Sequence, residues 1–191
     1  GMSVGQMQYL RIKDWLIDGA MADASLAVLP THYQASTFPQ RWQNKIAVVH
    51  EGVPEAMLQL PRLQQLTIAE GVTLGSDVPV VTFISRNLEP MRGFPTFMRA
   101  LPSLLTHHPT VQVVIVGGDD VSYSSAPGDG RSWRDHLLGE LGDRIDRNRV
   151  HLFGRMPHDQ LQKMYRRSDL HVYLSKAFVL SWSLLELMAC G

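Results

Sequence analysis

The sequence predicts an α/β protein in which a parallel sheet is covered by helices on both faces. From Val78 onward, strand-like apolar runs alternate with segments whose apolar residues have helical spacing. The strand-like runs are almost uninterrupted, as expected for parallel strands that are buried on both faces. With 191 residues, of which 45% are apolar, the chain is large enough to bury a substantial core.

The first 52 residues are expected to form a remnant of a separate domain. Apolar side chains recur at helical spacing at Tyr9, Ile12, Leu16 and Ala20. Two short buried strands are then expected, at "SLAVLP" and at "KIAVVHEGV". Residues 53–77 show no clean period, so we expect them to form a connector between the two domains.

A larger domain is expected over residues 78–191. Its strands are predicted at "VPVVTFIS", "VQVVIVGG", "RVHLFG" and "DLHVYLS". The buried faces of the intervening helices are predicted at Phe94, Phe97, Leu101 and Leu105, at Trp133, Leu137 and Leu141, and at Leu161 and Tyr165. Pro102 lies inside the first of these helices and is expected to kink or shorten it. The stretch "DDVSYSSAPGDGRS", rich in Gly, Ser and Asp, is expected to be a mobile surface loop.

The charge balance and the single cysteine exclude several classes of protein. There are 18 Lys and Arg residues and 18 Asp and Glu residues, so no overall field would recruit nucleic acid or an anionic membrane. Cys190 is the only cysteine, which rules out an internal disulfide and fits a reducing compartment such as the cytoplasm. Every apolar run is far shorter than the roughly 18 to 20 residues that span a bilayer.

An anion site is predicted at the end of the first strand of the larger domain. In an open parallel sheet, ligands bind beyond the carboxyl ends of the strands. Arg86 follows the strand directly, and Arg92 and Gly93 precede the next helix. Two guanidinium groups beside a helix N-terminus suit a pyrophosphate group, because forked donors and free N–H groups meet one anion. The alternative is a surface pair of Arg86 with Glu89, leaving Arg92 in solvent.

The other strand ends are less specific. Gly117 and Gly118 in "VGGDD" would let a backbone approach a ligand closely, but a strand followed by Gly is more often a tight turn. Asp119 and Asp120 fit a helix cap or a solvated loop better than a metal site. The histidines lack the spacing of a metal site, so we expect no metal. The sequence also lacks the G-x-G-x-x-G order of a dinucleotide-binding turn.

The chain ends on "KAFVLSWSLLELMACG", an apolar run that is expected to be a helix. It holds one carboxylate, Glu186. That carboxylate either faces solvent or meets a polar partner that the sequence does not reveal.

Four stretches, taken in order, carry a family resemblance. They are "SRNLEPMRGF", "HPTVQVVIVGGDD", "RVHLFGRMPHDQLQKMYRRSDLHVYLS" and "FVLSWSLLELMACG". Together they resemble the nucleotide-sugar half of family 4 retaining glycosyltransferases, whose GT-B fold consists of two facing Rossmann-like domains. The stretch "PTHYQASTFPQRWQNKIAVVHEGV" resembles the end of the N-terminal, acceptor-side domain. The resemblance thus implies a GT-B fold that is incomplete at both ends of this chain.

The resemblance also implies roles for particular residues. Arg86 and Arg92, with Gly93, would bind the diphosphate; Arg92 stands where the family usually has Lys, which keeps the charge. Glu186 matches the second glutamate of the family's E-x(7)-E signature and would bind the ribose hydroxyls. The first glutamate of that signature falls on Phe178, so the identity of the sugar is left open. Further donor contacts would come from Met156, against the base, and from backbone N–H groups of Phe178, Val179, Leu180 and Ser181.

On this resemblance the whole enzyme would move a sugar from a UDP- or GDP-sugar to a hydroxyl of a glycan or lipid-linked acceptor, with retention. It would serve polysaccharide biosynthesis and need no metal or other cofactor. Groups that activate the acceptor, and any contact with a membrane surface, would lie largely outside this chain. The chain alone is expected to be inactive and to self-associate.

Two other functions are considered. One is a degenerate, non-catalytic binding module that uses the altered segment "KAFVLSWS". The other is an NDP-sugar epimerase of the same two-domain architecture, which is disfavoured because no acid and base pair can be placed at the strand ends.

Overall fold

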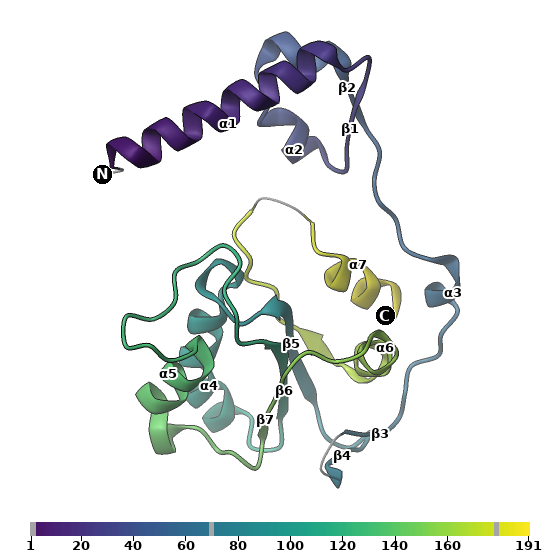
Figure 1. Cartoon of the computed structure of the whole chain (residues 1–191). Helices are drawn as coiled ribbons and strands as arrows, with labels where there is room; N and C mark the ends of the chain where they lie inside the picture. The colour runs from purple at the N-terminus through teal and green to yellow at the C-terminus, as the bar shows by residue number, and fades with distance from the viewer. Residues whose placement is uncertain (1–2, 69–70, 178–179) are drawn as a thin grey trace. The chain divides into compact units, whose positions relative to one another are not determined.

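The computed structural model describes residues 3–68, 71–177 and 180–191 (Figure 1). The chain divides into two compact units. Among the described residues, one comprises the chain up to Gly52 together with Leu180, and the other comprises Val53–Ala177 and Ser181–Gly191. No helix in the described residues is long and apolar enough to cross a membrane.

The first unit holds a two-stranded parallel sheet with helices. Its elements are α1 (Val4–Asp23), β1 (Ala27–Leu29), α2 (His32–Ser36), a 3-10 helix (Gln40–Lys45) and β2 (Ile46–Val48). Ala27 pairs with Ile46 in the parallel register. Ser3 begins α1 with a capping box, because its hydroxyl accepts from the N–H of Gln6 while the Gln6 side chain accepts from the N–H of Ser3. The predicted helix and both predicted strands are therefore present.

Helix α1 is attached by polar contacts more than by its apolar side chains. Asp18 accepts hydrogen bonds from Arg41 at 2.5 Å and from the indole of Trp42 at 2.7 Å. The ammonium of Lys45 donates to carbonyl oxygens near the end of the helix, at Met21, Ala22 and Ala24. The predicted apolar positions Ile12 and Leu16 are exposed. The spacing thus predicted the helix correctly but not a face that is buried within this unit.

The second unit is built on a four-stranded parallel sheet in the order β7-β6-β5-β8. Its strands are β5 (Val80–Asn87), β6 (Gln112–Gly118), β7 (Val150–Phe153) and β8 (Leu170–His171). Phe83 of β5 lies opposite Ile115 of β6, which in turn lies opposite Leu152 of β7. The predicted parallel sheet is confirmed, although β8 is shorter than its apolar stretch indicated.

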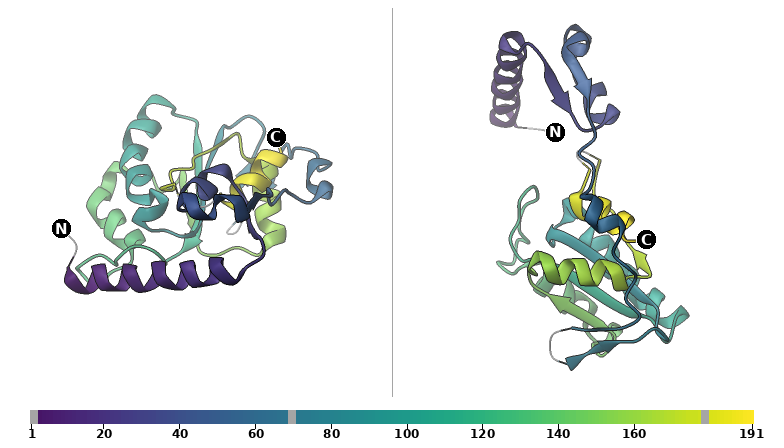
Figure 2. Two further views of the ribbon diagram at one scale, coloured as in Figure 1. Left: turned by 90° about the horizontal axis from the view of Figure 1, so that it is seen from above. Right: turned by 90° about the vertical axis from the view of Figure 1, so that its right-hand side faces the viewer.

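Helices cover both faces of this sheet, as the sequence predicted (Figures 1 and 2). On one face lie α4 (Phe94–His107) and α5 (Trp133–Leu141), and on the other lie α6 (His158–Arg167) and α7 (Trp182–Ala189). The first core is centred on the rings of Phe83 and Phe97, which stack with their centroids 4.9 Å apart. In the second core, Val114 of the sheet packs with Met164 and Tyr165 of α6. Each face of the sheet therefore has its own hydrophobic core.

Helix α4 runs through Pro102 without a break, so of the two expected effects, a kink or a shortening, the shortening does not occur. A proline removes one backbone hydrogen bond from a helix, and its ring crowds the carbonyl group four residues before it. Phe97, Leu101 and Leu105 of α4 are buried against the sheet, and this packing outweighs the missing bond.

Residues 53–77, which we expected to form a connector, contribute to the second unit. They contain α3 (Glu55–Leu58) and an antiparallel hairpin of β3 (Leu66–Thr67) and β4 (Thr73–Leu74). Met57 and Leu74 are buried in the core that α6 covers. The guanidinium of Arg167, only 2% exposed, donates to the carbonyls of Leu74 and Gly75 and to Val78 O at 2.7 Å. This segment is therefore held to the second unit by packing in that core and by hydrogen bonds from α6.

Candidate functional site

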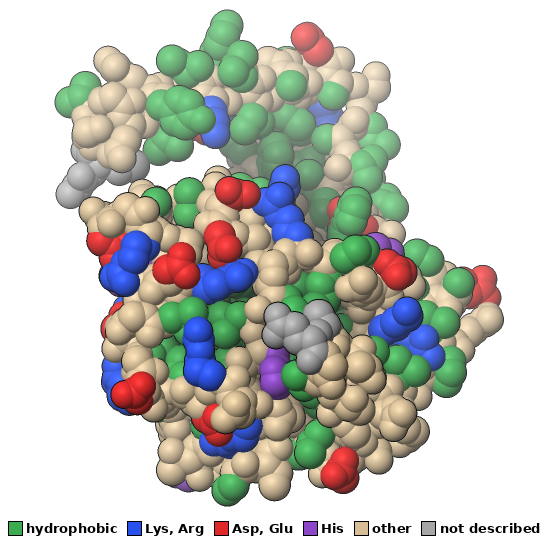
Figure 3. All heavy atoms as spheres, turned by 60° about the horizontal axis from the view of Figure 1, so that its bottom comes forward, with side chains coloured by type: hydrophobic (Ala, Val, Ile, Leu, Met, Phe, Trp, Pro, Cys, Tyr) green, Lys and Arg blue, Asp and Glu red, His purple; other side chains and the backbone are tan. Residues whose placement is uncertain are grey.

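The carboxyl ends of the four parallel strands lie along one edge of the sheet, and the predicted arginines stand there. Arg86 is the penultimate residue of β5 and is exposed. Arg92 ends a 3-10 turn (Pro90–Arg92) that leads directly into α4. On the face shown in Figure 3, Lys and Arg side chains are interspersed with Asp and Glu. The structure thus places Arg86 at the end of β5 and Arg92 in the turn that follows it, on the same connection of the sheet.

Glu89 is not a surface partner of Arg86, so that alternative is wrong. Its side chain is completely buried. Its Oε2 atom accepts hydrogen bonds from three consecutive backbone N–H groups, those of Ser122, Tyr123 and Ser124, at 3.1, 3.0 and 2.9 Å. The beginning of the loop after β6, which we expected to be mobile, is thus anchored beside the arginine turn.

Gly93 is required by the close approach of the chain that follows β8. Its φ angle is 78°, a left-handed conformation that favours glycine. A Cβ atom at this position would lie 2.3 Å from Leu174 Cβ and 2.7 Å from the Leu174 carbonyl oxygen. Next to this contact, Lys176 N–H donates to the carbonyl of Met91 at 2.9 Å. The segment that leads toward α7 therefore runs directly alongside the arginine turn.

Asn87 joins three strand ends by hydrogen bonds. It is 2% exposed, donates from Nδ2 to the hydroxyl of Ser122 at 2.7 Å, and accepts from Nη2 of Arg155 at 3.0 Å. Arg155, which follows β7, also pairs with Asp120 at 2.8 Å. A Cβ atom on Gly118 would lie 2.8 Å from both Asn87 Oδ1 and Arg155 Nε. Gly118 therefore makes room for protein side chains, not for the backbone approach of a ligand that its position suggested.

The neighbouring "VGGDD" positions are also engaged by the protein. A Cβ on Gly117 would lie 2.7 Å from Leu88 Cδ2. Arg134 of α5 donates to the carbonyls of Gly117 and Phe153 at 3.0 and 3.1 Å, and it pairs with Asp119 at 3.0 Å. Within the described residues, no group of His, Cys, Asp and Glu side chains is arranged to hold a metal ion.

Glu186 meets polar partners from α6. Its side chain is 17% exposed, and its Oε1 lies 2.9 Å from Nε2 of His158. Burial, together with the charge of Glu186, raises the pKa of Tyr165 well above its ordinary value, so this phenol stays protonated. Glu186 is therefore not a solvated surface carboxylate. Across the described ranges it makes no ion pair or hydrogen bond with Arg86 or Arg92.

The remaining predicted donor contacts lie near the start of α7 and of α6. Phe178 and Val179 lie outside the described residues. Leu180 is partly buried, and Ser181 precedes the first residue of α7. The Ser181 hydroxyl contacts the Ser183 hydroxyl at 2.7 Å and does not cap the helix. The backbone N–H groups of the first turn of α7 are thus not satisfied by that side chain.

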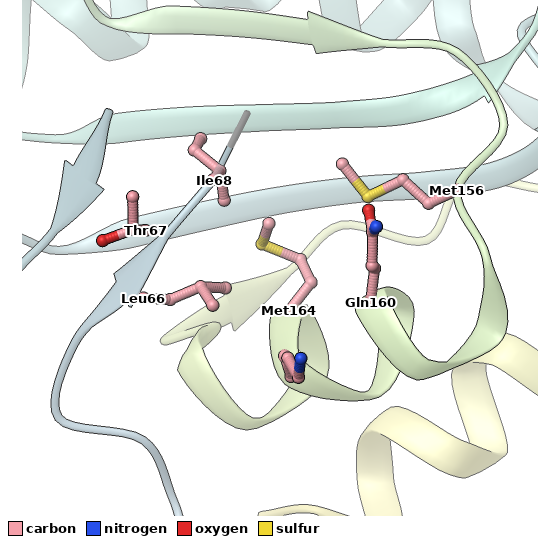
Figure 4. Close-up of a pocket in the computed structure, with 7 residues that line it drawn as sticks. Leu66, Thr67, Ile68, Met156, Gln160 and Met164 are labelled. Atoms are coloured by element: carbon pink, nitrogen blue, oxygen red, sulfur yellow. The ribbon is translucent and has the colours of Figure 1, made fainter. Parts of the chain in front are cut away.

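Met156 lines a cavity of about 320 Å³ between α6 and the β3–β4 hairpin (Figure 4). Figure 4 shows Met156 beside Gln160, with Ile68 and Leu66 of the hairpin segment facing α6. The described lining includes neither arginine of the anion site and no part of α7. The cavity beside Met156 is lined by both apolar side chains, such as Leu66, and polar ones, such as Gln160.

Asn87, Tyr123 and His158 were not predicted as parts of this region, and Glu89 was considered only as a surface partner of Arg86. For two of these residues the sequence does contain an indication that they lie at the site. Asn87 and Glu89 lie within three residues of Arg86, at the strand end where ligand-side residues gather. Tyr123 and His158 carried no such signal, because their partners are distant in the sequence.

Comparison with known proteins shows which family the chain resembles. The family described as glycosyl transferases group 1 matches residues 67–191, and the family described as glycosyl transferase family 4 group matches residues 2–57. An uncharacterized glycosyltransferase of Methanocaldococcus jannaschii is 26% identical over 151 residues, which cover 78% of this chain and 35% of that protein.

Solved structures share the fold. A variant of S. aureus TarM matches with a TM-score of 0.62 at 16% identity, covering 89% of this chain and 29% of that one. Sucrose-phosphate synthase from Thermosynechococcus elongatus matches with a TM-score of 0.60 at 21% identity, covering 88% and 39%. These are GT-B proteins, and this chain spans roughly a third of their length. Because the family match extends over more than half of the residues, the chain belongs to the group 1 glycosyl transferases.

Proposed function

We propose that this chain provides the donor-binding part of a retaining glycosyltransferase that moves a sugar from a UDP- or GDP-sugar to a hydroxyl of a glycan or lipid-linked acceptor. One observation carries the proposal. Arg86 lies at the end of β5 and Arg92 in the turn that follows, and the segment that leads to α7 is fixed beside that turn by Gly93 and by the Lys176 hydrogen bond.

The arginines suit the chemistry of a diphosphate leaving group. When the bond between the sugar and the diphosphate breaks, negative charge develops on the phosphate oxygens. Guanidinium groups and backbone N–H groups at a helix start would offset that charge, so the proposal includes no metal ion. Phe178 and Val179 would contribute N–H groups, as would Leu180 and Ser181 at the start of α7.

Glu186 would hold the ribose of the nucleotide. A carboxylate accepts hydrogen bonds from the two adjacent ribose hydroxyls, and the partly buried position of Glu186 strengthens such bonds. His158, at 2.9 Å, would keep Oε1 in place while the ribose binds. In this arrangement Met156 would lie against the base.

Related proteins support a nucleotide ligand. The S. aureus TarM variant was crystallised in complex with fondaparinux, α-GlcNAc-glycerol and UDP. A pneumococcal O-GlcNAc transferase, which this chain matches with a TM-score of 0.54, was crystallised with UDP and GlcNAc. We place the activity in the cytoplasm, where Cys190 would stay reduced, and in polysaccharide biosynthesis.

Calorimetric titration with UDP, GDP and their sugar conjugates tests the proposal. Saturable binding of a nucleotide, displaced by the matching NDP-sugar, is expected. If neither nucleotide binds, the donor-binding role is wrong, and a non-catalytic binding module takes its place.

A further inference from the structure

The ring of Tyr123 lies against the guanidinium of Arg92. The guanidinium carbon is 5.5 Å from the ring centroid, which is within the range of a cation–π contact. Arg92 belongs to the turn after β5, whereas Tyr123 belongs to the loop after β6. Two neighbouring strand ends therefore meet at this pair.

The position of Tyr123 is fixed by hydrogen bonds on both sides of it. The buried carboxylate of Glu89 accepts from the N–H of Tyr123 and from the N–H groups of the residues before and after it. The Ser122 hydroxyl accepts from Asn87 at 2.7 Å, and the Ser124 hydroxyl accepts from the N–H of Met91 at 2.9 Å. The loop can therefore not shift at this point without breaking several of these bonds.

We propose that Tyr123 is a positioning residue for Arg92. Its ring holds the guanidinium ready for the diphosphate, and Glu89 fixes the turn that presents the ring. The inference rests on the proposed donor-binding function and deepens it, because it assigns a role to a loop that makes no predicted contact with the ligand.

The physical reason is the conformational entropy of arginine. A long side chain loses rotamer freedom when it binds an anion, and this loss weakens binding. A guanidinium that is already held over a ring loses less freedom when a phosphate arrives. A cation–π contact uses the face of a guanidinium, whereas phosphate oxygens accept from its in-plane N–H groups, so the two interactions use different parts of the group.

The test is calorimetric titration of the protein with inorganic pyrophosphate and with UDP. The variants are Tyr123→Phe, Tyr123→Leu, Arg92→Ala and the combination of Arg92→Ala with Tyr123→Leu. Tyr123→Phe keeps the ring and should bind as the wild type does. Tyr123→Leu should bind both ligands about three- to tenfold more weakly. In the Arg92→Ala background, Tyr123→Leu should have no further effect, because the group that the ring positions is gone.

A second measurement follows the stack directly. In the nitrogen-15 NMR spectrum, the Nε–Hε signal of Arg92 is the one that is missing from Arg92→Ala. This signal should carry a ring-current shift in the wild type and in Tyr123→Phe. The shift should disappear in Tyr123→Leu. Glu89→Gln, which weakens the anchor of the turn, should reduce both the shift and the affinity for pyrophosphate if the variant folds.

The outcomes separate this inference from the proposed function. If the wild type binds pyrophosphate and UDP but Tyr123→Leu binds them equally well, the positioning role is wrong and the donor site stands. Equal weakening by Tyr123→Leu with and without Arg92 also overturns the positioning role, because the ring would then act independently of Arg92. If the wild type binds neither ligand, the donor site itself is refuted, and the positioning role is refuted with it.

Discussion

His158 Nε2 lies 2.9 Å from Glu186 Oε1, so the first residue of α6 is joined to the middle of α7. The carboxylate that the sequence singled out is therefore held by a side chain and is only 17% exposed. A ligand that bonds to Glu186 must bind beside His158. The contribution of Glu186 to nucleotide affinity can be measured separately from that of the phosphate contacts.

Glu186→Gln should weaken UDP and GDP binding about tenfold or more. The substitution keeps the size of the side chain but removes the charge from its hydrogen bonds to ribose, which we expect to be worth about 1.5 to 3 kcal/mol. Pyrophosphate has no ribose, so calorimetry should find its affinity little changed. Glu140→Gln, which removes an exposed partner of Arg99, serves as the control and should change neither ligand. Equal loss of pyrophosphate and nucleotide binding would argue against a ribose contact.

Gly93→Ala should destabilise the second unit more than Gly130→Ala does. Both glycines have a left-handed φ, 78° and 76°, so either substitution introduces backbone strain of about 1 kcal/mol. Only at Gly93 would the new methyl group collide with Leu174, whereas no atom lies within 4 Å at Gly130. Gly93→Ala should therefore lose about 2 to 4 kcal/mol of unfolding free energy in urea titrations. Similar losses for both variants would mean that Leu174 does not approach Gly93 this closely.

Arg167→Met should lower the unfolding free energy by about 3 to 5 kcal/mol. The guanidinium is 2% exposed and bonds to the carbonyls of the 53–79 segment and to Asp169, so its loss leaves buried acceptors without a donor. The control is Arg62→Ala, which removes the other arginine on Asp169. Because Arg62 is 44% exposed, this change should lower stability by less than about 1 kcal/mol. Urea unfolding of the two variants checks the contrast, and a small effect of Arg167→Met would contradict it.

Stability should fall as the solution is acidified below about pH 6.5, because His171 is partly buried. Burial lowers the pKa of His171 from 6.5 to about 4. Between these two values the unfolded chain binds a proton that the folded chain does not. The contribution of neutral His171 to the free energy of unfolding is therefore fully present above pH 6.5 and is lost as the pH falls toward 4. At about pH 5 the loss should reach about 2 kcal/mol.

His171→Gln provides the comparison for this pH dependence. The amide can still bond to the hydroxyl of Thr82, which lies 3.0 Å from His171 Nδ1, but it does not titrate. Urea unfolding at about pH 7 and about pH 5 should show a smaller difference in the variant. His151, whose pKa burial also lowers, should account for part of the decrease that remains. An unchanged pH dependence in His171→Gln would rule out His171 as its source.

The periodicity of apolar residues in the sequence was sufficient to predict the parallel sheet and the helices that cover it. Buried strands such as β6 are continuous apolar runs, and α4 places Phe94, Phe97, Leu101 and Leu105 on one face, so local pattern and tertiary packing agree. Pro102 misled the expectation for α4, because the local penalty of a proline is visible in the sequence whereas the packing that outweighs it is not.

The surroundings of the candidate site were harder to predict from the sequence than the fold, because they depend on contacts between distant residues. Glu89 looks like a surface residue until three backbone N–H groups from more than 30 positions further along the chain enclose its carboxylate. Gly118 looks like a ligand cradle until Arg155 occupies the space beside it. Such assignments depend on which strand ends become neighbours, and this follows from the strand order, not from local composition.

The central claim is that Arg86 and Arg92 bind the diphosphate of a nucleotide. It is tested most directly by calorimetric titration of UDP, GDP and pyrophosphate into the wild type, Arg86→Ala and Arg92→Ala, each at low and high salt. Arg131→Ala is the control, because this exposed arginine on the loop before α5 pairs with Asp129. We predict a loss of about tenfold to a hundredfold for each of the two site variants, a weaker salt dependence in both, and no change for Arg131→Ala. Wild-type affinity in Arg86→Ala and Arg92→Ala, or no nucleotide binding by the wild type, would contradict the account.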